Sequence, residues 1–325
     1  MAHELDFSTG KAGVAYATGS AVPWHGLGQT VAPGASVEEW RKAGGLDWDA
    51  VRTEVIFNGL GDEYAFWPDK HVLYRSNTGR PLSVVSKDYQ TVQPGQILGF
   101  FKDLADQGGF QIETVGSLKE GRRIWALARV GENAPVQDDQ VAPYLMLATS
   151  FDGSMATTAA FTAVRIVCNN TLQRALTNSD GQHQVTIPHS AMFNPDSVRQ
   201  ELGIALTSWD GFMIKANKLA DRKVTDEEMD AYLLDIIESP YGKTYTPEQV
   251  RNSKGYQRIL GLFKGGQLGS GQDAINGTAW GMLQATTQFV DHEQGRLPDN
   301  RLDKAWFGVG AKFKEKAMKK VMELV

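Results

Sequence analysis

The segment from residue 141 to 176 constrains the fold most, because it reads as two long strands joined by a tight turn. The first run, VAPYLMLATS, is almost wholly apolar, and the second, residues 155–168, is rich in β-branched and small residues. Both compositions favour a half-buried antiparallel pair. Asp152 and Gly153 lie between the runs, and glycine supplies the positive φ that a tight hairpin turn needs. The sequence therefore predicts a β-hairpin near the middle of the chain.

The second strand is predicted to run directly into a short helix. Asn170 is the expected N-cap, and Gln173 three residues later gives the spacing of a capping box. Alternation along the strand places Arg165 among apolar neighbours, and Arg174 falls one turn into the helix. The hairpin and this helix are therefore expected to bring basic and amide side chains together.

The segments before the hairpin are predicted to form mostly strands that are neighbours in sequence. Strand patterns occur at residues 51–57, 71–75, 81–87, 110–115 and 122–130, and the turn residues 77–79 predict a hairpin between the second and the third. Helix patterns occur at 36–45, where Ser36 and Glu39 have capping-box spacing, and at 94–107, where an apolar stripe falls on one face. Few strand–helix–strand alternations are present, which argues against a doubly wound nucleotide-binding fold. The fold class expected is α+β, a mainly antiparallel sheet with packed helices.

After His189 the pattern changes to helix. Helical stripes of apolar residues cover residues 195–220, as one long helix or two, and residues 225–237, 246–263, 278–292 and 302–325. Thr225 and Glu228 form the expected cap of the helix at 225–237. The change predicts a β-rich domain over residues 1–194, with an irregular N-terminal arm, and a helical C-terminal region over residues 195–325. The helical region is either a second domain or a set of helices packed on the same core.

Composition excludes several classes of protein. Cys168 is the only cysteine, which rules out an internal disulfide and every multi-cysteine zinc motif. No apolar run reaches the roughly 18 residues of a membrane helix, and the N-terminus lacks a signal-peptide pattern. We therefore expect a cytoplasmic protein with no membrane partner. The net charge is −5, so any surface for nucleic acid must be local.

Most enzyme signatures are absent from the sequence, including GxxxxGK[ST], GxSxG and HExxH. The glycine-rich stretch at 265–271 follows a helical pattern and not a strand, which indicates a linker. His183 and His189 flank a short strand, where hydrogen bonding is favoured over metal ligation. The weakest alternative is a hydrolase that uses residues 291–293 with His25 or His189. We expect no cofactor and no metal.

The remaining chemical signal is a set of basic, amide and aromatic residues assigned to one sheet and its hairpin. An arginine fork suits phosphate, and each neutralised phosphate releases counterions. Tryptophan could stack on bases. The alternative is that these residues form internal salt bridges with the 38 acids of the chain. The predicted nucleic-acid contacts are Lys119, Arg122, Arg123, Arg129, Arg165, Asn169, Asn170, Arg174, Trp24 and Trp125.

Three blocks of the sequence resemble the phage and plasmid-like protein family built on the DUF932 domain. They are AGVAYATGSAVPWHGLGQTV at residues 12–31, the pair YQTVQPGQILGFF and GSLKEGRRIWALARV, and the run through VRIVCNNTLQRAL that ends at residue 176. Phe151 departs from the family pattern, because a histidine is expected there in the Ser-x-Asp-Gly-Ser turn. Any role of that histidine is therefore in doubt in this chain.

The resemblance implies a protein of mobile elements that acts in genome maintenance, recombination or defence. In outline the fold is similar to single-strand annealing proteins of the Rad52 type, a likeness of architecture without matched motifs. The leading prediction is a phage or plasmid protein in a bacterial host that binds single-stranded DNA and promotes strand annealing without nucleotide, as a homo-oligomer. The alternative is a non-catalytic, self-assembling interaction protein that binds a host or phage protein.

Overall fold

The computed structural model covers the whole chain and describes residues 5–19, 27–106, 110–165, 170–173, 184–206, 208–237, 245–265, 275–295 and 301–325. The chain divides into two compact units. Unit 1 comprises Met1–Gly131, Tyr144–Ala160 and Gln182–Gly203, and unit 2 comprises Glu132–Pro143, Phe161–Gly181 and Ile204–Val325. The mixture of helices with a mainly antiparallel sheet confirms the α+β class. The predicted domain boundary after residue 194 stays a prediction.

The large sheet has the strand order β11-β10-β9-β7-β6-β1-β2, with β12 paired to β10 and β8 paired to β9. The pair β1–β2 is parallel, whereas β1–β6, β6–β7 and β7–β9 are antiparallel. The strands are β1 (Val14–Ala17), β2 (Gln29–Val31), β6 (Phe110–Leu118), β7 (Arg123–Val130), β8 (Ala134–Val136), β9 (Asp139–Ser150), β10 (Thr157–Arg165), β11 (Asn170–Gln173) and β12 (Gln184–Ile187). The adjacent β9 and β10 confirm the predicted hairpin.

The helix predicted from Asn170 is wrong, because the chain forms strand β11 there. Strand β11 pairs antiparallel with β10, from Arg165 opposite Asn170 to Thr162 opposite Gln173. The capping-box spacing is a local signal worth about 1 kcal/mol. Pairing with the edge of β10 satisfies the backbone of the whole segment and outweighs that signal.

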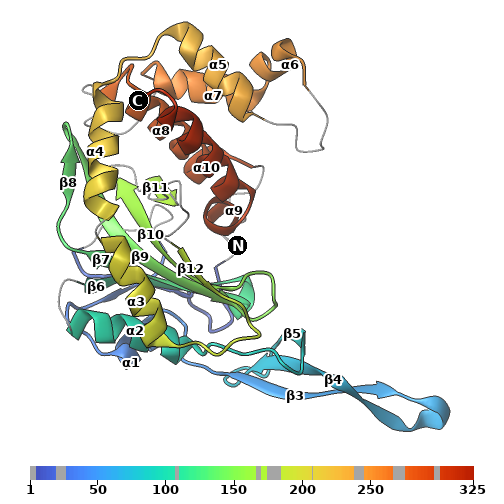
Figure 1. Cartoon of the computed structure of the whole chain (residues 1–325). Helices are drawn as coiled ribbons and strands as arrows, with labels where there is room; N and C mark the ends of the chain where they lie inside the picture. The colour runs from blue at the N-terminus through green and yellow to red at the C-terminus, as the bar shows by residue number, and fades with distance from the viewer. Residues whose placement is uncertain are drawn as a thin grey trace. The chain divides into compact units, whose positions relative to one another are not determined.

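Two short helices cover part of the large sheet within unit 1 (Figure 1). Helix α1 (Val37–Ala43) has the predicted capping box, in which Ser36 and Glu39 bond to each other's backbone. Helix α2 (Pro94–Asp106) packs on β6 and β7 through the predicted apolar stripe. The buried stripe residues of α2 include Ile97, Leu98, Phe101 and Leu104.

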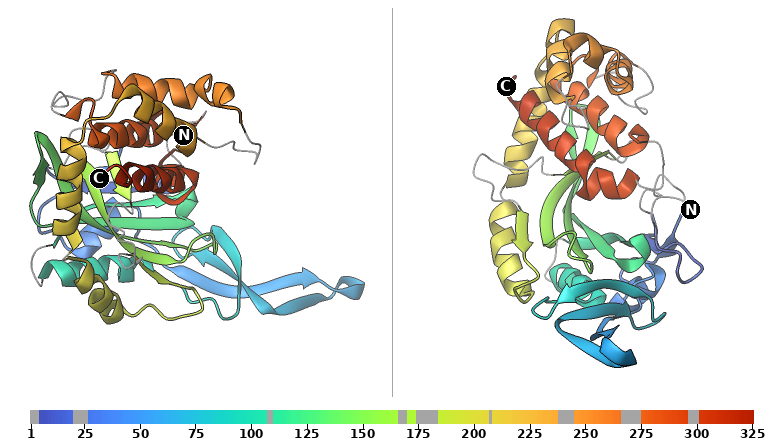
Figure 2. Two further views of the ribbon diagram at one scale, coloured as in Figure 1. Left: turned by 45° about the horizontal axis from the view of Figure 1, so that its top comes forward. Right: turned by 90° about the vertical axis from the view of Figure 1, so that its right-hand side faces the viewer.

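A second sheet of unit 1 has the order β3-β4-β5, from β3 (Ala50–Asn58), β4 (Tyr64–Arg75) and β5 (Pro81–Ser86). The predicted hairpin between β4 and β5 is confirmed, but β4 begins seven residues before the predicted strand at 71. Only residues 70–74 of β4 pair with β5. The rest of β3 and β4 forms a two-stranded ribbon that projects from the body of unit 1 (Figures 1 and 2).

The helices from residue 195 onward are shorter than the sequence predicted. Two predicted spans each divide in two, at the new N-cap Ser253 and at Gly308. A capping side chain at the first break, and the conformational freedom of glycine at the second, compete with continuation of the helix. Residues 195–220 hold two helices, which is one of the two arrangements that the sequence predicted there. No helix in the part of the chain that the structure describes has the length and apolar character needed to cross a bilayer. The helices are α3 (Pro195–Leu206), α4 (Ser208–Asp221), α5 (Asp226–Ile236), α6 (Pro247–Arg251), α7 (Lys254–Phe263), α8 (Ala279–Gln288), α9 (Arg301–Phe307) and α10 (Val309–Met322).

The centre of unit 2 is helix α8, which is buried from Ala279 to Thr287. It packs against α4, α7 and α10 and continues into a π-helical turn, Phe289–Glu293. Trp280 of α8 donates its indole N–H to Asp139 of β9 at 3.0 Å, inside the same unit. A helix that is buried on every side belongs in a core, and the hydroxyls of Thr286 and Thr287 bond to carbonyls of α8 itself.

Candidate functional site

The turn between β6 and β7 carries two of the predicted nucleic-acid contacts. Lys119 opens the single-turn helix η2 (Lys119–Gly121), and Arg122 follows it. Glu120 in this turn forms an ion pair with Arg80 at 2.6 Å, whereas the Arg122 side chain is exposed. The turn is tight, because Lys119, Glu120 and Gly121 all have positive φ. Arg122 is therefore a cation that solvent or a ligand can reach.

The predicted contacts on β7 lie mostly inside unit 1. Arg123 is 5% exposed and donates from Nη2 to Ser154 Oγ at 2.8 Å. Trp125 is 3% exposed and covers Gly116, where a β-carbon would lie 2.7 Å from the indole ring. Arg129 is half-buried. Arg123 and Trp125 would have to leave their packed positions to reach phosphate or bases.

The other predicted contacts cannot be placed by their side chains. Arg165 and Asn170 are backbone partners at the end of the β10–β11 pair. Trp24, Asn169 and Arg174 lie outside the described residues. A continuous basic groove through all of these positions therefore stays a prediction.

A polar cluster within unit 1 ties the β9–β10 turn to the segment that precedes α2. The two ring nitrogens of His189 lie 3.0 Å from the carbonyl oxygens of Gln90 and Met155. The ring stacks on Tyr89 with centroids 4.3 Å apart, and the Tyr89 hydroxyl donates to the carbonyl of Ser150 at 2.8 Å. The hydrogen-bonding role predicted for His189 is confirmed. The cluster therefore links the β9–β10 turn to the segments that contain Tyr89 and His189.

Two groups of this cluster have shifted pKa values. Burial raises the pKa of Tyr89 to about 12. Burial would also raise the pKa of Asp152, but hydrogen bonds from Ser154 and the charge of Arg123 outweigh it, so the pKa of Asp152 is lowered. Asp152 is thus a stable carboxylate that accepts the Ser154 N–H at 3.0 Å. These contacts hold the turn, and neither group has the pKa near neutrality that suits a general base.

Phe151, at the position where the family resemblance led us to expect a histidine, belongs to the hydrophobic core. Its side chain is fully buried against Trp48, with ring centroids 5.2 Å apart. Its carbonyl accepts a hydrogen bond from Ser83. A phenyl ring at this position packs and offers no proton-transfer chemistry.

The acids at residues 291–293 are engaged in ion pairs within unit 2. Asp291 accepts from Lys314 Nζ at 2.6 Å, and both side chains are buried. Glu293 forms a two-pronged pair with Arg258, whose Nη2 lies 2.8 Å from Oε1. Among the described residues, no group of three or more His, Cys, Asp or Glu side chains could hold a metal ion. Carboxylates paired in this way are poor candidates for the hydrolase alternative.

Sequence reasoning missed the buried lysine of this pair. Lys314 lies three residues before Ala317 and seven before Val321, so it shares the buried face of α10. Burial lowers its pKa, and the charge of Asp291 opposes that shift. A lysine in register with an apolar stripe was the signal that could have predicted the pair.

The outer part of the β3–β4 ribbon, residues 55–67, carries a concentration of exposed apolar side chains; we name it the arm tip. Cross-strand partners are Val55 with Trp67, Ile56 with Phe66, and Phe57 with Ala65. Directly opposed residues point to the same face, so both faces of the ribbon are apolar. The exposed side chains, each 49% to 99% accessible, are Ile56, Phe57, Leu60, Tyr64, Phe66 and Trp67.

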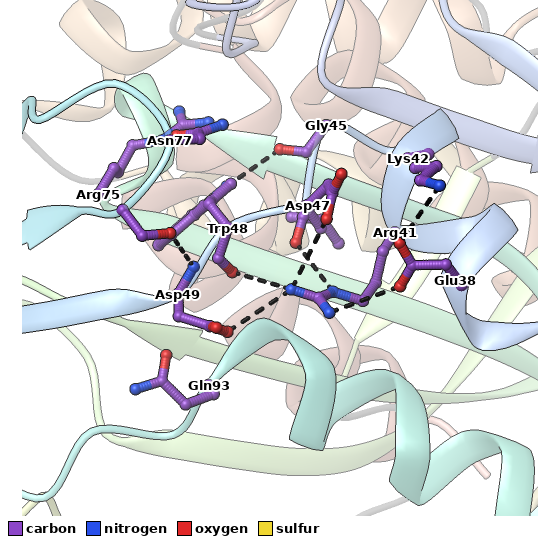
Figure 3. A network of polar contacts seen from close by, with 12 residues as sticks. Glu38, Arg41, Lys42, Gly45, Asp47, Trp48, Asp49, Arg75, Asn77 and Gln93 are labelled. Atoms are coloured by element: carbon purple, nitrogen blue, oxygen red, sulfur yellow. Dashed lines mark hydrogen bonds and ion pairs between the residues drawn. The ribbon is translucent and has the colours of Figure 1, made fainter.

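The base of the ribbon is fixed by a network of polar contacts (Figure 3). Arg75 is fully buried, forms an ion pair with Asp6, and lies 4.6 Å from the centre of the Trp48 ring. The Gln93 amide accepts from the Ala50 N–H at 2.8 Å and donates to its carbonyl at 3.1 Å.

Arg41 fixes the loop that leads into β3 (Figure 3). It donates to the carbonyls of Leu46 and Trp48, each at 3.3 Å, and lies 3.5 Å from the Asp49 carboxylate. These contacts, together with those of Arg75 and Gln93, hold both strands where they leave the body of unit 1. The ribbon therefore has a defined direction within that unit.

The family model for the domain of unknown function DUF932 matches residues 81–306 of this chain. That segment is more than half of the 325 residues. The chain belongs to the DUF932 family. Comparisons with curated proteins and with solved structures find no match.

In this DUF932 protein the matched segment includes the β9–β10 turn with its Tyr89 and His189 cluster. The arm tip at residues 55–67 precedes the match, so family membership carries no statement about it. The sequence signal for the tip is a pair of apolar runs, VIF and YAFW, around a glycine-rich turn. Sequence reasoning recognised the first run as a strand and left the second unassigned.

Proposed function

We propose that this DUF932 protein is a non-catalytic interaction protein that docks a protein partner through the arm tip. The observation that carries the proposal is the exposure of six large apolar side chains on one ribbon. Single exposed apolar side chains are ordinary on a protein surface, whereas a cluster of them marks an interaction site.

The charge of the ribbon supports a protein partner over a polyanion. From residue 54 to residue 69 the chain has four acids, Glu54, Asp62, Glu63 and Asp69, and no lysine or arginine. Nucleic-acid surfaces need cations close to the phosphates. An apolar surface with acids at its margin fits the apolar core and polar rim of a protein interface.

A photo-crosslinking amino acid at Leu60 tests this function in the native cells. Leu60 is 99% exposed at the end of the arm tip, and Met192, which is 80% exposed elsewhere in unit 1, is the matched control. We expect a discrete covalent adduct from position 60 and only diffuse background from position 192. Equal labelling at both positions, or none at position 60, would contradict the proposal.

Single-stranded DNA binding and strand annealing by a phage or plasmid homo-oligomer, without nucleotide, is the second candidate function. The exposed guanidinium of Arg122 beside Lys119 favours it. Arg129, Arg165, Asn169, Asn170, Arg174 and Trp24 remain proposed contacts. Arg123 and Trp125, which are buried, are left out of the proposed contact surface.

A gel shift on a single-stranded oligonucleotide tests the second candidate. We expect binding at about 50 mM salt that weakens steeply as salt rises, and a slope reduced by about one unit for Arg122→Ala. Lys42→Ala is the control, because Lys42 is an exposed cation of α1 outside the predicted track. Absence of binding at low salt removes this candidate and leaves the arm proposal intact.

A further inference from the structure

We infer that the partner docked by the arm tip is a second copy of this chain, added edge to edge at strand β3. The inference deepens the proposed docking function and rests on it. The two copies would form a two-fold symmetric pair in which β3 of one runs antiparallel to β3 of the other. Such isologous contacts are the commonest route to homodimers.

The two edges of the ribbon differ in how they are protected against pairing. Strand β4 has three extra residues, 68–70, between the partners of Glu54 and Val55, and Pro68 among them has no N–H to donate. The inner part of β4 already pairs with β5. Strand β3 contains no proline and no lysine, and in the described part of the chain it pairs with β4 alone. An edge without these protections is a template for strand addition.

Contacts at both ends of β3 fix which backbone groups point outward. At Ala50 the N–H and carbonyl bond to the Gln93 side chain and not to β4. At Gly59 the N–H bonds inward to the carbonyl of Glu63 at 2.7 Å. Because the direction alternates along a strand, the outward groups between these ends belong to Arg52, Glu54, Ile56 and Asn58.

One register pairs all four outward positions with a second copy. A two-fold axis at Val55 sets Arg52 opposite Asn58 and Glu54 opposite Ile56, twice by symmetry. Val55 then faces itself across the axis. Trp67 and Phe57 lie on the same face as Val55, so both copies would gather apolar side chains around the axis.

Pairing of two copies also changes the stability of the ribbon itself. It converts two strands into four, and an isolated two-stranded ribbon is only marginally stable in water.

A cysteine at the proposed axis tests the register directly. All variants carry Cys168→Ser, so that the introduced thiol is the only one. We expect Val55→Cys to form a covalent dimer under mild oxidation, because opposed residues at the axis have β-carbons about 5 Å apart. Thr53→Cys is the control. In the same register the two cysteines at position 53 would be offset by about four residues along the strands, a separation of roughly 13 Å. Equal cross-linking of both variants would overturn the register.

Solution mass tests the pairing without introduced thiols. We expect the wild-type chain to sediment at twice 35.7 kDa and Ile56→Pro at 35.7 kDa, because proline removes an outward N–H of β3. Tyr64→Pro is the matched control on β4. Tyr64 is the cross-strand partner of Asn58, and its backbone N–H points away from β3 at the opposite edge of the ribbon, so this variant should keep the dimer. A wild-type monomer, or a dimer that survives Ile56→Pro, overturns the inference.

The two proposals fail separately in these experiments. A monomeric chain whose Leu60 photo-adduct contains a different protein overturns pairing of two copies and keeps the docking function. A monomeric chain with no adduct overturns both. A dimer that depends on β3, with the adduct formed between two copies, supports both.

Discussion

The base and the tip of the β3–β4 ribbon are built from opposite kinds of residue. At the base, the charged Arg75 is fully buried and paired with Asp6, and polar side chains satisfy the backbone. At the tip, aromatic and aliphatic side chains face water on both sides. Burial of a charged group is unfavourable in free energy, and burial of an apolar group is favourable. Both ends therefore reverse the usual arrangement, in which apolar groups are buried and charged groups are exposed. The base fixes the direction of the ribbon, and the tip is left to contact another molecule.

Replacement of Arg75 by methionine should give the largest loss of stability. It leaves the Asp6 carboxylate, 2% exposed, buried without its partner. We expect the free energy of unfolding to fall by about 3–5 kcal/mol. Arg80→Met is the control, because Arg80 pairs with Glu120 at the surface and such pairs contribute about 1 kcal/mol or less. Equal losses in urea titrations of the two variants would contradict the contrast.

Tyr89 should make the stability of the base depend on alkaline pH. Its carbonyl accepts from Arg52, and burial raises the pKa of its hydroxyl to about 12. The unfolded chain loses this proton near pH 10 and the folded chain near pH 12, so stability is lost as pH rises between them. We expect wild type to lose about 1 kcal/mol by pH 11 relative to Tyr89→Phe. Parallel curves for the two proteins between about pH 8 and 11 would refute this.

Gln93→Leu should cost about 1–2 kcal/mol, because the Ala50 N–H and carbonyl each lose a hydrogen bond. Gln90→Leu is the control, since the Gln90 amide makes only a 3.4 Å contact to Asp88. Thermal unfolding of both variants is the measurement. A smaller loss for Gln93→Leu than for its control would mean that the end of β3 is held by other contacts.

Leu60→Ser at the tip should have the smallest effect on the fold. The side chain is 99% exposed, so its removal should change the free energy of unfolding by no more than about 0.5 kcal/mol. The comparison needs protein dilute enough for wild type to be monomeric, because assembly itself stabilises the folded state. A loss of 2 kcal/mol or more would show that the tip packs within its own chain.

Local signals in the sequence were sufficient for much of the fold. The Asp152-Gly153 turn and the capping boxes of Ser36 and Thr225 depend on residues a few positions apart, and the structure has all three. The helix predicted at Asn170 failed because its segment found a strand partner, β10, which local spacing does not reveal. The outer half of β4 was missed because Pro68 interrupts the strand pattern.

The candidate sites were harder to predict, because they depend on exposure. Alternation along β7 places Arg123 and Trp125 on one face, but alternation alone cannot tell that this face is buried. Lys314 is of a residue type that is usually exposed, but it lies in the core. The arm tip shows the reverse, since an apolar run such as YAFW reads as core and lies in water. An apolar residue is buried only where a neighbouring element packs over it, and the residue type alone does not show whether one does.

Pairing of two copies through the ribbon can be measured by sedimentation equilibrium of the wild-type chain beside a variant with Phe57, Leu60 and Phe66 all changed to serine. We expect twice 35.7 kDa for wild type and 35.7 kDa for the variant, with the unfolding free energy of the monomer preserved. Wild type that stays at 35.7 kDa at every concentration, or a variant that keeps the doubled mass, would contradict it.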